Sequence, residues 1–198
     1  MKRTSRYEIR SERQLKALVL PLRAEIVELV ASLGPMSASD IAELLGRRRP
    51  AIHYQLNKLT EVGLLRPAGS RGEGREAQAL YATPGKPMGV VFQPEKPRVV
   101  ELIAGYASSL LKRSQRVLSQ ALRRPDAVTS GKRRNTHAAQ FTCRLDRAQL
   151  AELNAHLDAI RRLCAPSKQK SEGALHLVTL TLAPLDTPAG RNPVSDTP

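Results

Sequence analysis

Basic and polar side chains are concentrated in one short stretch of the chain, residues 47–58. It opens with three consecutive arginines, whose guanidinium groups can neutralise phosphates or form paired hydrogen bonds with the edge of a guanine. Tyrosine, asparagine and lysine follow, and their side chains can donate hydrogen bonds to bases or phosphates. The stretch therefore has the chemistry to bind a nucleic acid.

A helix that starts at Pro50 would sort these side chains onto two faces. At about 100° per residue, Ile52, Leu56 and Leu59 share one narrow stripe, which must face the protein. The polar residues lie opposite and could enter a major groove. Two further arginines lie in a glycine-rich loop over 70–76, where they could reach phosphates or a minor groove. The predicted DNA contacts are Arg47, Arg48, Arg49, Ala51, His53, Tyr54, Asn57, Lys58, Arg71 and Arg75.

These features also have explanations that need no ligand. A run of arginines often forms a solvated surface, and Tyr54 could pack on the hairpin instead. The glycines from Gly69 to Gly74 resemble a dinucleotide-binding loop, but such a loop joins a strand to a helix, whereas this one joins two expected strands. We therefore expect no cofactor. The charge favours a polyanionic partner, because 32 Lys and Arg face 18 Asp and Glu, a net charge of +14.

The preceding elements predict how this stretch is held. Apolar residues recur at helical spacing over 14–33, and Pro21 divides that region into two helices because proline breaks a helix interior. Ser37 and Asp40 have the spacing of a capping box at the start of the next helix. Gly46 would end that helix in a left-handed conformation. Its buried stripe is expected to be Ile41, Leu44 and Leu45.

After the basic stretch, the pattern predicts a hairpin. The helix over 50–62 would be followed by strands over 64–69 and 77–83, and Pro67 favours an edge position for the first strand. Two short helices, a tight turn and a glycine-tipped hairpin are the order of a winged helix-turn-helix domain.

The second half of the chain predicts a long helix and a small strand-helix-strand unit. Its helix over 98–122 carries apolar residues at alternating steps of three and four, the seam of a coiled coil. This seam suits a dimer, and the alternative is packing within the same chain. It comprises Val100, Ile103, Ala107, Leu110, Ser114, Val117 and Ala121. The other expected segments are a frayed arm over 1–13, linkers over 84–97 and 123–138, strands over 140–145 and 174–183, a helix over 146–164 and a disordered tail over 186–198.

Nothing in the sequence forms a catalytic or metal-binding group. The candidate ligands Cys143, Cys164, His137 and His176 lack the close pairing of a structural zinc site. The two cysteines are therefore expected to be small core residues. No nucleophile stands beside a base, and no polar cluster marks an effector pocket. The start of the chain is charged and no apolar run approaches the roughly 20 residues that span a bilayer. We expect a cytoplasmic protein that is not an enzyme and has no membrane partner.

Residues 15–85 resemble the arsenic-repressor (ArsR-type) family of winged-helix regulators. The resemblance covers a little over a third of the chain. It implies that residues 48–58 are the recognition segment and that the protein is a homodimer on a two-fold operator. Metal-sensing members carry paired cysteines on the helix that here spans 39–45, and this chain has none there, so we expect no metal. The matching residues are Leu15–Leu18, Pro21–Arg23, Ile26–Val30, Gly34–Ala42, Pro50–Ile52, Leu56, Leu59, Gly63–Leu65 and Leu80–Tyr81.

The sequence thus predicts a mostly α fold with small β parts. A winged helix-turn-helix domain at 11–85 would precede a dimerisation and possible regulatory region at 95–185. The function expected is sequence-specific binding of duplex DNA by a homodimeric transcription regulator. Two alternatives stay open: a winged-helix module that binds protein or RNA, and a small enzyme in the C-terminal unit. Competition by duplex DNA against single-stranded RNA would separate the first alternative, and a polar pocket would favour the second.

Overall fold

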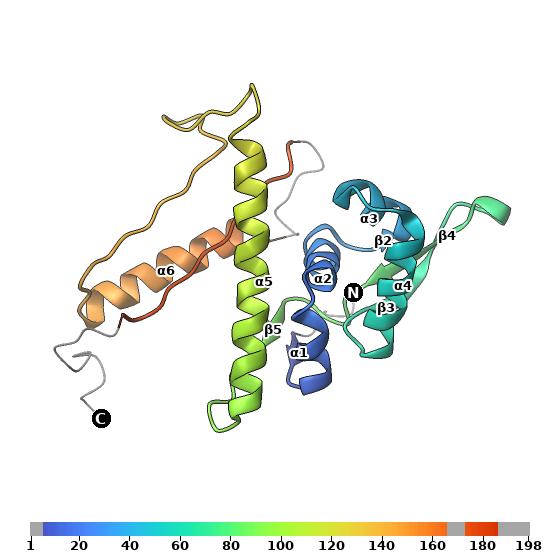
Figure 1. Cartoon of the computed structure of the whole chain (residues 1–198), viewed down its shortest axis with the longest axis horizontal. Coiled ribbons are helices and arrows are strands. Elements are labelled where there is room, and N and C mark those ends of the chain that lie inside the picture. Colours follow the sequence, from blue (N-terminus) through green and yellow to red (C-terminus); the bar gives the residue numbers. More distant parts are fainter. Residues whose placement is uncertain (1–5, 166–172, 186–198) are drawn as a thin grey trace. The chain divides into compact units, whose positions relative to one another are not determined.

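The computed structural model describes residues 6–165 and 173–185, apart from the side chain of Arg75, and is mostly helical (Figure 1). The chain divides into two compact units, residues 1–113 and 114–198. The helices are α1 (Glu12–Leu18), α2 (Pro21–Leu33), α3 (Ala38–Leu45), α4 (Arg49–Glu61), α5 (Pro97–Ala121) and α6 (Arg147–Leu163), with a short 3₁₀ turn at Gly74–Glu76. The strands are β1 (Tyr7–Ile9), β2 (Met36–Ser37), β3 (Arg66–Arg71), β4 (Gln78–Ala82) and β5 (Met88–Val90).

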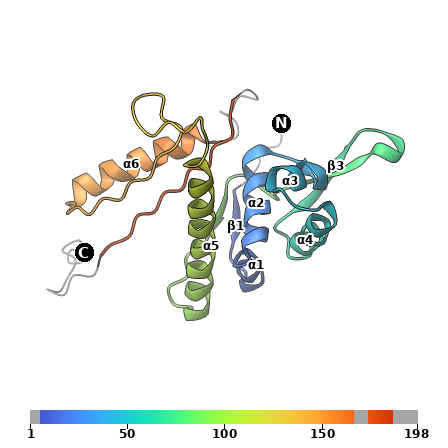
Figure 2. The same ribbon diagram turned by 45° about the horizontal axis from the view of Figure 1, so that its top comes forward.

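The N-terminal unit is built on one aliphatic core. An antiparallel sheet of order β2-β4-β3 lies beside helices α1 to α4, and the β3–β4 hairpin extends away from the helices (Figure 2). Strand β3 is at the edge of this sheet, as Pro67 predicted. The fully buried side chains of the core include Leu15, Leu18, Ile26, Val30, Ile41, Ile52, Leu56, Leu59 and Leu64.

The predicted helix boundaries around Pro21 and Ser37 are confirmed. Helix α1 ends at Leu18 and α2 begins at Pro21. The Ser37 hydroxyl accepts a hydrogen bond from the Asp40 amide at 3.2 Å, and the Asp40 carboxylate accepts one from the Ser37 amide at 2.9 Å. Gly46 ends α3 with φ 59° and ψ 41°. The expected stripe of α3 is wrong at one position, because the buried face is formed by Ala38, Ile41 and Ala42 and leaves Leu44 47% exposed at its edge.

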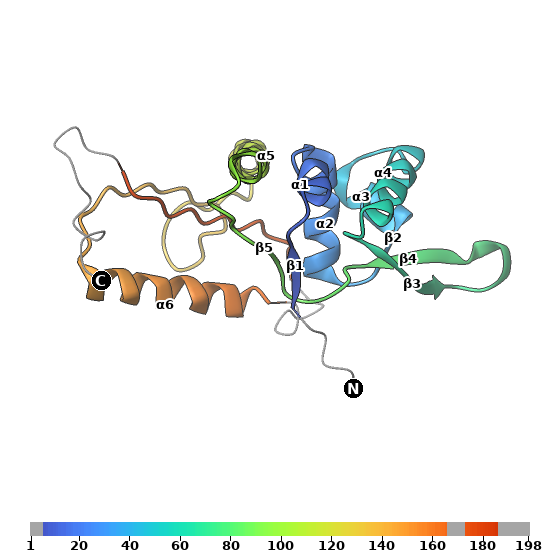
Figure 3. The same cartoon turned by 90° about the horizontal axis from the view of Figure 1, so that it is seen from below.

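A parallel pair of short strands replaces the expected N-terminal arm and part of the first linker. Strand β1 pairs with β5, with Tyr7 opposite Met88 and Ile9 opposite Val90, and Figure 3 shows the two side by side. Ile9 of this pair is buried in the core of the unit. Strands of three residues are too short to display the alternation by which a strand is recognised in sequence.

The first half of α5 packs on its own chain, the alternative that the sequence left open. Val99 and Leu102 enter the core, and Ser109 donates a hydrogen bond to the carbonyl oxygen of Val19 at 2.7 Å. Tyr106 donates to Glu28 at 3.4 Å, and burial together with the Glu28 charge raises the pKa of the tyrosine. The face that α5 buries here lies beside the predicted seam; of the seam residues, Ile103 packs against this core.

The C-terminal unit has a helix where one was predicted, but the two flanking strands do not form. Helix α6 begins at a capping box between Asp146 and Gln149, as predicted. Residues 140–145 and 174–183 are extended and form no strand ladder in the described chain. Their patterns favour strands, but a strand also needs a partner strand for its backbone groups, and neither segment pairs with another in the described chain. The strand-helix-strand prediction is therefore corrected to a single helix with two extended flanks.

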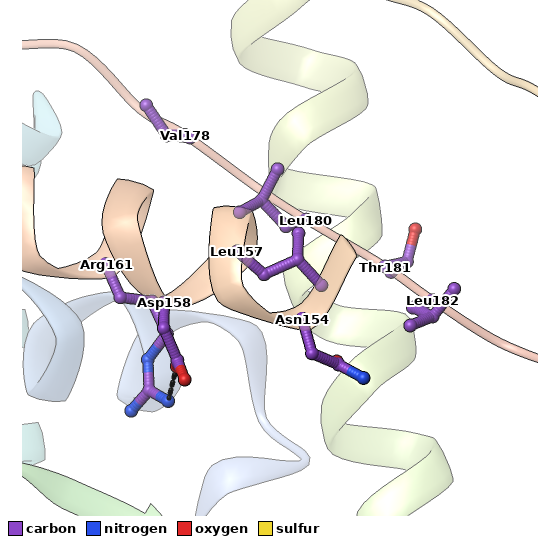
Figure 4. A pocket seen from close by; sticks show the side chains of 8 residues that line it. All are labelled: Asn154, Leu157, Asp158, Arg161, Val178, Leu180, Thr181 and Leu182. Atoms are coloured by element: carbon purple, nitrogen blue, oxygen red, sulfur yellow. Dashed lines mark hydrogen bonds and ion pairs between the residues drawn. The ribbon is translucent and has the colours of Figure 1, made fainter. Parts of the chain in front are cut away.

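Several predictions about individual residues of this unit also change. Cys143 and Cys164 are both exposed, because the strand and helix faces that were expected to bury them do not pack together in one chain. A cavity of about 410 Å³ lies between α6 and the extended segment. Figure 4 shows the side chains that line it: Asn154, Leu157, Asp158, Arg161, Val178, Leu180, Thr181 and Leu182. The expected disordered tail, 186–198, lies outside the described residues. Among the described helices, none is long and apolar enough to cross a membrane.

Candidate nucleic-acid interface

The three arginines lie in the turn between α3 and α4 and at the first residue of α4. The left-handed Gly46 reverses the chain, and the Arg47 amide donates to the Ala42 carbonyl oxygen at 2.9 Å. Arg48 is the N-cap of α4, and its side chain forms no capping hydrogen bond. All three arginines are exposed. Their charges therefore gather at the positive end of the α4 dipole, a combination that attracts anions.

Helix α4 is held by one face and exposed on the other. Ile52, Leu56 and Leu59 are each 0% exposed, which confirms the stripe derived from the helical wheel. Among the predicted contacts on this helix, Ala51, Tyr54 and Asn57 are exposed, whereas His53 and Lys58 are half-buried. Tyr54 is 56% exposed and does not pack under the hairpin. A rigid helix with a polar outward face is the geometry required for insertion into a groove.

Lys58 is engaged within its own helix. Its Nζ lies 3.0 and 3.1 Å from the two carboxylate oxygens of Glu61 and 5.9 Å from the centre of the Tyr54 ring. The ammonium group is thus near the outward face, but any phosphate it bound would compete with Glu61.

The two predicted arginines of the wing, the hairpin formed by β3, β4 and the loop between them, have different surroundings. Arg71, at the end of β3, donates to Asp40 Oδ1 at 2.7 Å and to Gln78 Oε1 at 3.2 Å. This contact fastens the hairpin to the start of α3 and was not predicted, because the two residues are 31 positions apart in sequence. Arg75 follows on the wing loop, but its side chain lies outside the described structure. The exposed Arg66, also on β3, was missed by the sequence analysis.

Asp40 therefore joins the start of α3 to the β3–β4 hairpin. Burial opposes ionisation of its carboxyl group, but hydrogen bonds from Arg71 and from Ser37 outweigh that effect and hold the pKa of Asp40 below its ordinary value of 3.8. The carboxylate stays charged at neutral pH, so it both caps α3 and positions the wing arginine.

A buried polar network fixes the far end of α4. Gln14 Nε2 donates to the Tyr7 hydroxyl at 2.7 Å and to the Val62 carbonyl oxygen at 3.0 Å. The Tyr7 hydroxyl donates in turn to the Gly63 carbonyl oxygen at 3.0 Å. Near the middle of the helix, Arg23 Nε donates to Gln55 Oε1 at 2.8 Å. These positioning residues were missed because polar side chains separated by dozens of residues leave no local pattern.

The fold and this exposed helix define a winged helix-turn-helix domain. In a comparison with protein families, residues 20–68 match the model of a helix-turn-helix domain. That match covers α2, α3, α4 and the start of β3, the same segment that holds the basic turn. No curated protein matches the sequence.

Solved structures of two transcriptional regulators and of one further protein give distant comparisons. The repressor BigR from Xylella fastidiosa is 21% identical, with 48% of this chain and 77% of that chain covered, at a TM-score of 0.29. Regulator Tm0710 from Thermotoga maritima is 12% identical, with coverage of 76% and 82%, at 0.35. The YusO protein from Bacillus subtilis is 17% identical, with coverage of 78% and 82%, at 0.32. At these TM-scores, none of the likenesses decides the function of this chain.

Proposed function

We propose that the protein is an ArsR-type transcription regulator that binds duplex DNA sequence-specifically, as a homodimer on a two-fold operator. The observation that carries this proposal is the two-sided burial of α4. Three apolar side chains on one face are completely buried, while Tyr54, Asn57 and the arginines at the helix start are exposed. The buried face therefore holds the helix in place, and its polar face stays accessible to a ligand.

Each part of the surface has its own task in this proposal. Arg48 and Arg49 read base edges in the major groove, with Tyr54 and Asn57 further along the helix. Lys58 and the wing contact the phosphate backbone, which contributes affinity without sequence information. A dimer bound at a promoter would then compete with other proteins for the same DNA.

The homodimer is supported by apolar surface that a single chain leaves uncovered. In the C-terminal unit, Phe141 is 84% and Leu163 is 75% exposed, and five apolar residues between 175 and 182 are 39–59% exposed. Surface of this kind favours association. A two-fold dimer would also place two recognition helices about one turn of DNA apart, as paired half-sites require.

The test is selection of genomic fragments by the purified full chain at about 0.15 M salt, where weak electrostatic binding is suppressed. Wild type would be compared with Arg49→Ala and Tyr54→Ala. We expect wild type to recover a shared two-fold motif, and the variants to lose or relax it at one position per half-site. Loss of a base-reading arginine should cost about 1–3 kcal/mol.

Lys58→Ala is the matched control for a contact without sequence information. It should weaken binding equally on every duplex and reduce the salt slope by about 1. Recovery of fragments without a motif, unchanged in the variants, would overturn sequence-specific recognition. Displacement of the duplex by single-stranded RNA at equal concentration would point to an RNA-binding module instead.

A further inference from the structure

Half of the net charge of the chain lies outside the helix-turn-helix domain, in one short region. Residues 112–134 contain eight Lys and Arg but one acidic residue, Asp126, which gives a net charge of +7 out of +14. Asp126 is already engaged, since its carboxylate accepts hydrogen bonds from Arg124 at 2.7 and 2.9 Å. No other acidic residue lies within the region.

The region ends in a loop whose base is closed by Asn135. The Asn135 side chain accepts from the Val128 amide at 2.9 Å and donates to the Asp126 carbonyl oxygen at 2.9 Å. The Asn135 amide donates to the Val128 carbonyl oxygen at 2.9 Å. Next to it, Thr136 is 7% exposed. These contacts close a loop with a tip of six residues, 129–134.

The tip presents three consecutive cations to solvent. Gly131 has φ +73°, a conformation that favours glycine and turns the chain. Lys132, Arg133 and Arg134 follow, all exposed. None of the three forms an ion pair in the described part of the chain. Three adjacent like charges repel one another, and binding to a polyanion relieves that repulsion.

We propose that this loop, residues 126–136, is a second DNA-contacting element that binds the phosphate backbone of the duplex. The inference rests on the proposed function, which assigns DNA contacts to the N-terminal unit alone. The ligand class follows from the chemistry of the tip: its ammonium and guanidinium groups bind phosphate oxygens, and no apolar or aromatic side chain between residues 129 and 134 could stack on a base or pack on a thymine methyl. Such a contact adds affinity on any sequence and leaves specificity unchanged.

The experiment compares two triple variants of the full chain that carry the same charge. Lys132→Gln, Arg133→Gln and Arg134→Gln remove the tip cations. Arg144→Gln, Arg147→Gln and Arg162→Gln remove three exposed cations elsewhere in the same unit. Dissociation constants are measured on one selected duplex and one scrambled duplex over a range of salt concentrations. Thermal unfolding checks that each variant is folded.

We expect the tip variant to lower the slope of log K against log salt by about 3, because each phosphate contact contributes about 0.9. The loss of affinity should be the same factor on both duplexes, and the control variant should keep most of the wild-type slope. Asn135→Ala, which retains every charge but opens the loop base, should also weaken binding on both duplexes.

Equal changes of slope in the two triple variants would overturn the inference, because the charge would then act only through the general field. That result leaves the proposed function standing, since the selected motif and its loss in Arg49→Ala do not depend on the loop. If wild type binds no duplex, the proposed function itself fails and takes the inference with it.

Discussion

Asp40 shows how one side chain can serve both folding and the site. It completes the capping box of α3 and accepts the hydrogen bond from Arg71 that holds the wing. Because its pKa in the folded protein lies below the ordinary value of 3.8, the charged form stabilises the fold above that pH. The contribution is lost as the pH falls through the lowered pKa.

Asp40→Asn is therefore expected to destabilise the protein at pH 7 by about 1 kcal/mol, since it removes the charge from a cap and an ion pair. The difference from wild type should shrink as the pH falls below 3.8 and through the lowered pKa of Asp40. Urea unfolding over a series of pH values from 7 downward measures this. Glu43→Gln, on the exposed side of the same helix, is the matched control. A gap between wild type and Asp40→Asn that is independent of pH would contradict the assignment.

At the scale of elements, local sequence signals predicted the helices. Contacts between residues far apart in the sequence were not predicted. Pro21 and the capping boxes at Ser37 and Asp146 fixed helix starts, because each acts within four residues. The pairing of β1 with β5, by contrast, joins residues about 80 positions apart. The Arg71–Asp40 contact and the exposure of Cys143 likewise depend on which elements meet, and no local pattern carries that information.

Gly105 in α5 marks another contact between elements that are far apart in the sequence, the packing of α5 against the end of α1. Glycine in a helix interior costs about 1 kcal/mol relative to alanine, so its presence calls for a reason. A Cβ at position 105 would lie 3.2 Å from Cγ2 of Val19, a tight contact with a stiff β-branched side chain. The missing side chain lets α5 approach the end of α1 closely enough for Ser109 to bond the Val19 carbonyl oxygen.

A double-mutant cycle tests this reason. Gly105→Ala alone should gain little or lose stability, because crowding against Val19 offsets the helix propensity. In the Val19→Ala background the same change should stabilise by up to about 1 kcal/mol. Chemical unfolding of the four proteins gives the coupling energy. The close-approach explanation fails if Gly105→Ala has the same effect in both backgrounds.

At the scale of the whole molecule, the two units differ in how they are stabilised. The N-terminal unit has a continuous apolar core from Ile9 to Leu102. In the described part of the C-terminal unit, no apolar side chain is buried, and α6 has no buried residue at all. A helix with two extended flanks is too small to be stable by itself. Its exposed apolar side chains therefore favour burial against a second copy of the chain.

This difference predicts dimerisation that depends on the most exposed apolar residues. We expect sedimentation of wild type to show a dimer of 21.7 kDa chains, with a thermal midpoint that rises with concentration. Phe141→Asp with Leu163→Asp should shift the equilibrium to monomer. Gln140→Asp with His156→Asp introduces two aspartates at exposed polar positions of the same unit and should leave the dimer intact. A wild-type chain that stays monomeric at every concentration would refute the prediction.

The absence of tryptophan has an optical consequence. The chain has four tyrosines and no tryptophan, so the near-ultraviolet emission of the protein comes from tyrosine alone. Tyr54 is the only one of the four that is exposed, and it lies on the outward face of α4. A base stacked on that ring would quench a measurable fraction of the tyrosine emission. The native chain therefore carries its own fluorescent reporter at the surface proposed to read DNA.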